Sequence, residues 1–179
     1  MALYVFEGRK PKVGKTAYVH DKAVVIGRVT IGEGCFIGAG AVLRGDWGEI
    51  VVGDGSNIQE NAVLHAGPES TTHLSRNSHI GHAAILHGCV LDEHVLVGMG
   101  AIVNDGVKIG ENSLIGSGAL LPPRMQVPPN SLCVGVPARV IKEVDQKMAE
   151  FAWMGTRLYQ TLPGRYRATL VEVSLQDCQ

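Results

Sequence analysis

The sequence lacks an excess of charge of either sign and lacks long apolar runs. Lysine and arginine number 16 and aspartate and glutamate 17, a formal net charge of −1 over 179 residues. This balance gives no bulk electrostatic basis for binding nucleic acid or an anionic membrane. No apolar run approaches the roughly 18–20 residues that cross a bilayer, and residues 1–8 lack the basic and apolar regions of a signal peptide. We therefore expect neither nucleic-acid nor membrane partners.

Aromatic residues are scarce, at 5%, and closely spaced cysteine pairs are missing. The four cysteines, Cys35, Cys89, Cys133 and Cys178, form no CxxC motif, so we interpret them as reduced, mostly buried thiols of a cytoplasmic protein. Glycine is abundant, at 23 residues. This composition suits an interior of small and branched aliphatic side chains, and the chain length allows one domain with an appended terminal element.

The sequence is rich in aliphatic residues spaced six positions apart. The series is interrupted near residues 47–49 and 66–73 and takes one five-residue step before Leu91. Its members are Val19, Val25, Ile31, Ile37, Leu43, Val52, Ile58, Leu64, Leu74, Ile80, Leu86, Leu91, Val97, Val103, Ile109, Ile115, Leu121 and Val127. A hexad period predicts a parallel β-helix, an all-β solenoid of about six to seven coils. Three hexads form one triangular coil, and the marked residues stack into a continuous core.

A different period appears near the C-terminus, where apolar residues recur three, four or seven positions apart. These residues are Ile141, Val144, Met148, Phe151 and Leu158. The spacing indicates one apolar face of an α-helix over about residues 140–159. We therefore predict a β-helix domain, 1–139, and a C-terminal helix and tail, 140–179, with the helix packed on the flank of the solenoid. No structure is predicted for the tail after Pro163.

Register places two histidines one above the other. The residues that directly follow the inward leucines at 43, 64 and 86 are Arg44, His65 and His87, and they point outward in successive coils about 4.8 Å apart. His82 lies on the preceding face near a corner, where it could complete a site only on an adjacent subunit. Three imidazoles with one open position describe a catalytic zinc site, so the register indicates an intersubunit metal site. The alternative is a surface stack of histidines without a function.

Further polar residues gather around this stack by register. Asp46 follows Arg44 by two positions, Asn57 and Gln59 flank the inward Ile58, and Glu60 comes next. Outward charged residues are usually only solvated, and their position around stacked histidines is what makes them candidates. Other residues of similar chemistry are interpreted as packing, turn or surface residues: Cys89, His20, His79 and His94.

Taken together, these motifs resemble the γ-class carbonic anhydrase family. The resemblance rests on Arg44-Gly45-Asp46, Asn57-Ile58-Gln59-Glu60-Asn61, Leu64-His65 and Gly81-His82-Ala83-Ala84-Ile85-Leu86-His87-Gly88-Cys89, and it continues through Leu96-Val97-Gly98-Met99-Gly100-Ala101 to Gly135-Val136-Pro137-Ala138. Within that family the chain is most similar to the phenylacetic-acid-degradation and carnitine-operon subgroup, on the weaker cue of Gly155-Thr156 and Tyr159.

The resemblance implies a left-handed β-helix that assembles as a homotrimer, with three zinc sites at the interfaces. His65 and His87 would come from one subunit and His82 from the next. The implied activity is the reversible hydration of CO2 to bicarbonate. Iron(II) or cobalt(II) would also accept three imidazoles, so the residues alone do not select zinc.

The resemblance also implies roles for the surrounding residues. Gln59 would orient the attacking hydroxide, Asn57 would support Gln59, and Tyr159 would approach the site from the C-terminal helix. The remaining polar residues would form salt bridges between subunits: Arg44, Asp46 and Glu60.

Two acidic positions of strongly active family members differ in this chain. Trp47 stands where they carry a glutamate, and the loop after His65 holds one carboxylate, Glu69. Both acids serve proton transfer in those members, so we expect metal binding with slow turnover. Glu69, His73 or Tyr159 could relay the proton instead.

Three other functions stay open from the sequence. One is a metal-dependent thioesterase that cleaves an acyl-CoA. Another is a hexapeptide-repeat acyltransferase, which would use one histidine as a general base and need no metal. The third is a trimeric scaffold that retains the metal without catalysis.

Overall fold

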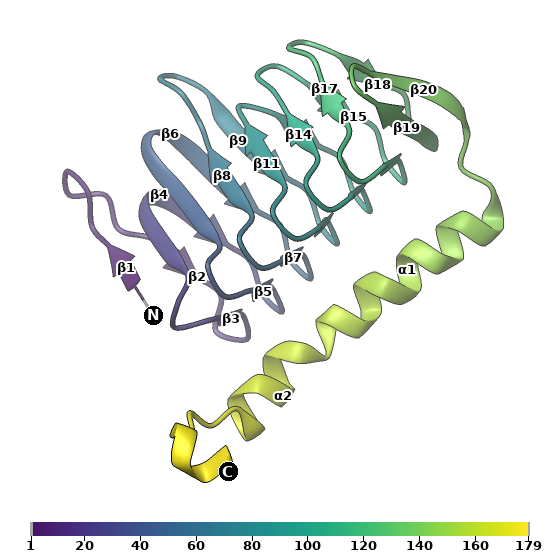
Figure 1. Ribbon diagram of the computed structural model, residues 1–179. Helices are drawn as coiled ribbons and strands as arrows, with labels where there is room; N and C mark the ends of the chain where they lie inside the picture. The colour runs from purple at the N-terminus through teal and green to yellow at the C-terminus, as the bar shows by residue number, and fades with distance from the viewer. Residues whose placement is uncertain (1, 179) are drawn as a thin grey trace.

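The chain forms a left-handed parallel β-helix with C-terminal helices along one side, as the computed structural model of residues 2–178 shows (Figure 1). The first of its three faces carries one strand from each of seven coils, followed by a closing strand. The strands of this face are β3 (Tyr18–Val19), β5 (Phe36–Ile37), β7 (Asn57–Ile58), β10 (His79–Ile80), β13 (Leu96–Val97), β16 (Leu114–Ile115), β19 (Ser131–Gly135) and β20 (Ala138–Glu143). The solenoid predicted from the hexad period is therefore confirmed.

The second and third faces form one sheet, because two long strands continue across the corner between them. These are β4 (Val24–Ile31) and β6 (Val42–Val52), and β6 pairs with β8 through its first half and with β9 through its second. The second face adds β8 (Val63–His65), β11 (Ile85–His87), β14 (Ile102–Val103) and β17 (Leu120–Leu121). The third adds β2 (Lys12–Val13), β9 (Thr71–Leu74), β12 (Val90–Leu91), β15 (Lys108–Ile109) and β18 (Gln126–Val127), while β1 (Ala2–Tyr4) pairs with β4.

The core is the stack of hexad residues predicted from the sequence. All eighteen are buried, from Val19 at 7% exposure to Leu86 at 0%. Each lies in register with its counterparts in the coils above and below, so the three faces contribute three vertical aliphatic columns. Fully burying one such side chain contributes about 1.5–3 kcal/mol to the stability of the fold. Because the inward residues are aligned in columns, the outward-pointing residues next to them along each strand are aligned in vertical rows as well.

The corners require left-handed backbone conformations. At the corner after the first face, Asn61 has φ of 61°, Ala83 has φ of 57° and Gly100 has φ of 65°. An L-residue with a Cβ atom tolerates this region at a cost of about 1–2 kcal/mol. Ala83 therefore marks a corner that the surrounding coils hold in place, and His82, which directly precedes it, is set at that corner.

The last coil is closed by an antiparallel strand, where the sequence predicted the start of a helix. Strand β20 folds back on β19, and α1 (Gln146–Gln160) begins only after Asp145, whose side chain accepts a hydrogen bond from the Met148 N–H at 2.9 Å. The predicted helix start at residue 140 was thus wrong. The β-branched residues Val140 and Ile141 favour a strand, and Asp145 supplies the N-cap that begins the helix.

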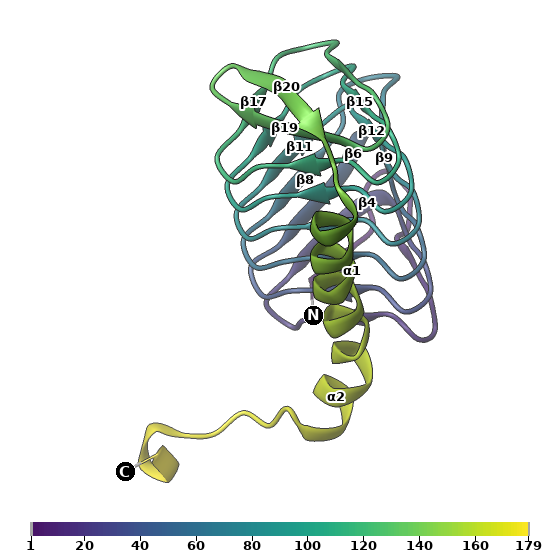
Figure 2. The ribbon, with the colours of Figure 1, turned by 90° about the vertical axis from the view of Figure 1, so that its right-hand side faces the viewer.

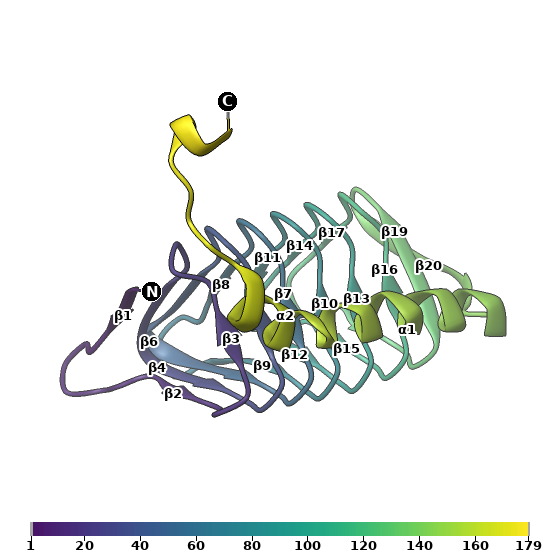
Figure 3. The same cartoon turned by 90° about the horizontal axis from the view of Figure 1, so that it is seen from below.

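Helix α1 runs back along the first face toward the N-terminal coils (Figures 2 and 3). The face that it buries is made of small residues, Ala152 and Thr156, rather than the predicted apolar stripe. Phe151 is 74% exposed and Leu158 is 60% exposed, so that part of the prediction was wrong. Small side chains let the helix backbone approach the sheet closely, while Phe151 and Leu158 stay largely exposed.

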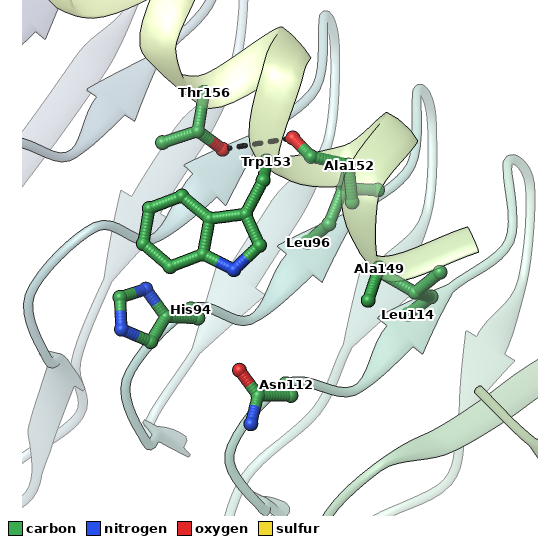
Figure 4. A pocket seen from close by; sticks show the side chains of 8 residues that line it. All are labelled: His94, Leu96, Asn112, Leu114, Ala149, Ala152, Trp153 and Thr156. Carbon is green, nitrogen blue, oxygen red and sulfur yellow. Dashed lines mark hydrogen bonds between the residues drawn. The ribbon is translucent and has the colours of Figure 1, made fainter. Parts of the chain in front are cut away.

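The contact between α1 and the solenoid includes a histidine beneath a tryptophan (Figure 4). The ring centroids of His94 and Trp153 are 4.0 Å apart, and both residues line a small cavity of about 10 Å³ with Asn112 and Thr156. Burial lowers the pKa of His94. The expectation that His94 is a plain turn residue was therefore incomplete, since its ring supports the docking of α1.

Helix α2 (Leu162–Thr169) continues from α1 and reaches the first coil. Arg167 donates hydrogen bonds to main-chain carbonyls there, including Thr16 O at 3.2 Å. Aromatic rings of Tyr18, Phe36 and Tyr166 pack with centroids 5.2–5.8 Å apart. The short helix η1 (Leu175–Cys178) lies beyond α2, away from the solenoid (Figure 2). No helix among residues 2–178 is long and apolar enough to span a membrane.

Candidate functional site

Two outward histidines stand in one vertical row on the second face. His87 of β11 is in register with His65 of β8, and His65 is in register with Arg44 of β6. This is the stack that hexad counting predicted. Inward Leu64 and Leu86 set the alternation, so the residue after each must point out of the core. We call these two imidazoles the His65–His87 pair.

The two rings of the His65–His87 pair face each other directly. His65 Nδ1 lies 2.9 Å from His87 Nε2. The far nitrogen of each ring contacts a carboxylate: His65 Nε2 lies 3.0 Å from Asp46 Oδ1, and His87 Nδ1 lies 2.6 Å from Asp105 Oδ1. Asp46 is held in turn by Arg44, whose Nη1 donates to Asp46 Oδ2 at 2.6 Å.

Hydrogen bonds keep the first carboxylate of this row ionised. Burial raises the pKa of Asp46, but hydrogen bonds from Arg44 and His65 outweigh burial and hold that pKa at about 2. An ionised carboxylate only accepts hydrogen bonds, so His65 Nε2 donates to Asp46. When His87 Nδ1 donates to Asp105 and both rings are neutral, the facing nitrogens carry lone pairs, and this is the form of imidazole that ligates metals.

His82 lies on a different face from the His65–His87 pair. It occupies the corner after β10, its side chain is 44% exposed, and its Nδ1 lies 2.7 Å from Glu60 Oε2. Among the residues from 2 to 178, no group of three or more histidines, cysteines, aspartates or glutamates within this one chain could hold a metal ion. The three predicted ligands are therefore not gathered within one subunit, and the intersubunit site stays a prediction.

A second polar cluster lies between the first face and α1. Gln59, His79, His82 and Tyr159 line a cavity of about 320 Å³, which we call the Gln59 pocket. Gln59 is 3% exposed and donates to Asn57 Oδ1 at 3.1 Å. The Tyr159 ring stands edge-on to His79 with centroids 5.3 Å apart, and burial raises the pKa of Tyr159. Gln59 and Tyr159 therefore line one pocket, and Asn57 is hydrogen-bonded to Gln59; the catalytic roles that the resemblance implies for them stay predictions.

His79 was missed as a site residue. It was expected to be a turn or surface residue, but it lies in β10, in register with Asn57 of β7, and its Nε2 is 2.7 Å from Gln59 Nε2. Burial, with a smaller effect of His82, lowers the pKa of His79 to about 4. Register alone could have placed His79 above Asn57, whereas its cover by α1 depends on a contact distant in sequence.

Asp105 was also missed, because its position in Asn104-Asp105-Gly106 indicated only a corner turn. Its signal was again the register: Val103 stacks on Leu86, so the polar residues after Val103 lie next to His87. By contrast, Cys89 is fully buried as a packing residue, as expected.

The predicted interface residues have partners within their own chain. Arg44 pairs with Asp46, and Glu60 pairs with His82. Their roles between subunits stay predictions. Trp47 is 62% exposed, and its ring centroid lies 6.1 Å from that of His65. Two of the proposed proton relays lie apart from the Gln59 pocket: Glu69 on an exposed loop and His73 on β9 of the third face.

Comparisons with known proteins agree with the coil architecture. Residues 10–45 and 88–123 match the family of bacterial transferase hexapeptide repeats, and residues 28–66 match the hexapeptide repeat of succinyl-transferase. The chain is 41% identical to the carnitine operon protein CaiE of Escherichia coli O7:K1, over 96% of this chain and 88% of that protein. It is 40% identical to CaiE of a Proteus species, over 97% and 88% of the two chains.

Two solved structures resemble the whole chain. One is a Bacillus cereus protein named provisionally as an acetyltransferase, with a TM-score of 0.92, 33% identity and coverage of 93% of this chain and 97% of that one. The other is a hexapeptide transferase family protein of Anaplasma phagocytophilum, with a TM-score of 0.87, 35% identity and coverage of 92% and 98%. The chain therefore belongs to the hexapeptide-repeat transferase family, in which its relatives include the carnitine operon proteins CaiE.

Proposed function

We propose that the protein is a zinc-dependent hydro-lyase of the γ-class carbonic anhydrase type, which hydrates CO2 reversibly at sites shared between subunits of a homotrimer. The observation that carries this proposal is the His65–His87 pair. Its two facing nitrogens, 2.9 Å apart, both bear lone pairs when the far nitrogens donate to Asp46 and Asp105. A contact of this length requires either a proton or an electron-pair acceptor between the two nitrogens, and we propose that the zinc ion takes this place in the loaded protein.

The donor set fits zinc. Two nitrogens bound at 2.0–2.1 Å to a tetrahedral zinc ion lie roughly 3.3 Å apart, so the two rings, 2.9 Å apart, would separate by about 0.4 Å to hold the ion. Zinc-binding histidines commonly donate their other ring N–H to a carboxylate, which fixes the tautomer and raises the basicity of the ligand. His65, His87 and His82 each have such a partner, in Asp46, Asp105 and Glu60 respectively.

The third ligand accounts for the proposed trimer. His82 is held at a corner of the solenoid, on a different face from the His65–His87 pair, so one copy cannot close the site. A cyclic assembly repeats the same contact between each neighbouring pair of subunits. His82 of one subunit would then complete the pair of the next, and the Gln59 pocket beside that His82 would adjoin the shared site.

A bound zinc ion would supply a Lewis acid that lowers the pKa of water to near neutrality. The residues of this chain would hold the zinc ion, orient the attacking hydroxyl group and exchange protons with it. Gln59 presents a fixed amide to the pocket, and Asn57 and His79 hold that amide. Tyr159 lines the pocket from α1. Trp47 and the single acid Glu69 leave few carboxylates for proton export, so we expect slow turnover.

A second candidate function is hydrolysis of an acyl-CoA thioester at the same site. The observation that favours it is an apolar groove of about 440 Å³ between α1 and the coils, lined by residues such as Leu114, Met148 and Phe151. It shares Leu96 with the Gln59 pocket. Hydration of CO2 needs no such groove, whereas an acyl chain would fill it. The acetyltransferase name of one structural neighbour agrees with acyl substrates.

A paired assay on one zinc-loaded preparation tests the proposal. Hydration of CO2 and release of free CoA from acyl-CoA are measured with and without an amine acceptor. We expect CO2 hydration that is lost in His87→Ala and kept in His20→Ala, a matched control because His20 also contacts a carboxylate, Asp21, at 2.8 Å. CoA release without an acceptor would favour the thioesterase, and acceptor-dependent release without metal would identify an acyltransferase. Absence of CO2 hydration in the zinc-loaded protein would refute the main proposal.

A further inference from the structure

His79 lies where the solenoid, the Gln59 pocket and α1 meet. Its ring stands above Asn57 of the preceding coil and below α1, where Thr156 Oγ1 lies 3.4 Å from His79 Nδ1. Tyr159 contacts the ring edge-on. Gly155 also faces it, because a Cβ atom there would lie 3.6 Å from His79 Cε1. The imidazole is therefore confined on several sides and can hold a neighbour in a fixed orientation.

The amide nitrogen of Gln59 lies between two acceptors. It is 3.1 Å from Asn57 Oδ1, which can only accept, and 2.7 Å from His79 Nε2. Both amide protons are used if His79 Nε2 carries a lone pair. The proton of the neutral ring is then on Nδ1, from which it can be donated to Thr156 Oγ1. In this arrangement Gln59 Oε1 is the one polar atom of the amide left to face the pocket.

The other tautomer of His79 would demand the opposite orientation of Gln59. Nδ1 would then accept from Asn57 Nδ2, which lies 3.2 Å away, and the Nε2 proton would require an oxygen at Gln59. That oxygen would lie against Asn57 Oδ1, so two acceptors would face each other. The tautomer with its proton on Nδ1 satisfies both protons of the Gln59 amide. It gives up the hydrogen bond between Asn57 Nδ2 and His79 Nδ1, and the Nδ1 proton goes to Thr156 Oγ1 instead. Burial keeps the ring neutral, since the pKa of His79 is lowered to about 4.

We propose that His79 is a positioning residue, whose unprotonated Nε2 accepts from the Gln59 amide and holds Gln59 Oε1 toward the pocket as a hydrogen-bond acceptor. The proposal rests on the proposed function in one respect: the acceptor would orient a hydroxyl group that attacks the substrate. Helix α1 takes part, because Thr156 selects the tautomer. Docking of α1 therefore fixes the polarity of the Gln59 amide indirectly, through His79.

The first test needs no activity. In protein labelled with ¹⁵N at histidine, a long-range ¹H–¹⁵N correlation spectrum reports which ring nitrogen of His79 is protonated. We expect a protonated Nδ1 and an unprotonated Nε2, assigned by the loss of these signals in His79→Gln. In Thr156→Val we expect the fixed tautomer to give way to a mixture. A proton on Nε2 in the native protein would overturn the proposal.

The second test uses a matched pair of variants and the substrate that the native enzyme turns over. The side-chain oxygen of His79→Gln can occupy the place of Nε2 and accept from Gln59, whereas His79→Asn places its amide near Nδ1 and leaves Gln59 without this acceptor. We expect His79→Gln to keep kcat within about threefold and His79→Asn to lose tenfold or more in kcat, with KM and zinc content unchanged. One mispositioned oriented hydrogen bond commonly costs this much.

Equal losses of kcat in the two variants, at equal zinc content and thermal midpoint, would overturn the positioning role. Failure of the proposed function is separable, because it would appear as a native enzyme without CO2 hydration. The ring-nitrogen spectrum would still decide whether His79 sets the orientation of Gln59.

Discussion

Removal of the Asp105 carboxylate should weaken metal binding without disturbing the fold. Asp105 Oδ1 lies 2.6 Å from His87 Nδ1, so it fixes the proton on the nitrogen remote from His65. Its side chain is 61% exposed, and its truncation therefore leaves no cavity in the core. Asp46 contacts the other ring of the pair but also binds Arg44, which makes it a less specific target.

The expected size of the effect follows from these contacts. Carboxylates that support a ligand histidine typically contribute a factor of 10 to 100 in metal affinity, equivalent to about 1.4–2.7 kcal/mol. Asp105→Asn keeps an oxygen that can accept from Nδ1 but removes the charge, so we expect about a tenfold loss. Asp105→Ala removes both, and we expect a loss nearer a hundredfold.

Competition of the protein with a chromophoric zinc chelator measures these affinities. Asp92→Asn is the matched control, because Asp92 is another exposed aspartate of the coils and follows the inward Leu91 on the third face. Thermal midpoints of the metal-free variants should be equal within error. If Asp105→Ala bound zinc as tightly as Asp92→Asn, the assignment of the His65–His87 pair as metal ligands would be refuted.

Three further outcomes follow from single residues. The pKa of His79 is lowered from 6.5 to about 4, so His79 binds a proton at a higher pH in the unfolded state than in the folded state. The free energy of unfolding of the metal-free protein should therefore fall by about 3 kcal/mol as the pH drops from 6.5 to 4. Urea titrations should show that His79→Gln lacks this contribution of His79 to the fall in stability. Trp47→Glu should raise the rate of CO2 hydration if proton export limits turnover, and buffer-independent kinetics without a rate change would contradict this. Ala152→Leu should lower stability by about 1–3 kcal/mol in the same titrations, because Ala152 is 9% exposed beneath α1; unchanged stability would show that α1 is not closely packed there.

The hexad period predicted much of what positions the site. An inward residue at every sixth position defines the face of each neighbour, so Leu64 and Leu86 were enough to stack His65 on His87. The same counting placed His82 on another face and Gln59 beside Asn57. Because each coil repeats the register of the one before it, the spacing of inward residues along the sequence predicts which side chains lie above one another in the solenoid.

The parts that spacing did not predict depend on contacts between distant segments. Val140 and Ile141 suit a helix face or a strand, and only pairing with β19 makes them a strand. Helix α1 buries the small Ala152 against the sheet and leaves Phe151 largely exposed in the apolar groove, a choice that the spacing of apolar residues does not specify. The role of His79 arises beneath that helix, so hexad counting treated it as a turn residue.

The site shared between subunits is tested most directly by complementation between two inactive variants. His82→Ala and His87→Ala are prepared separately, mixed in equal amounts, unfolded, refolded together with zinc and freed of unbound metal. If His65 and His87 come from one chain and His82 from its neighbour, random mixing restores about one site in four under cyclic symmetry. We predict zinc retention near a quarter of the native level, against little for either variant refolded alone. Zinc retention in the mixture no higher than in the single variants would contradict a site shared between subunits.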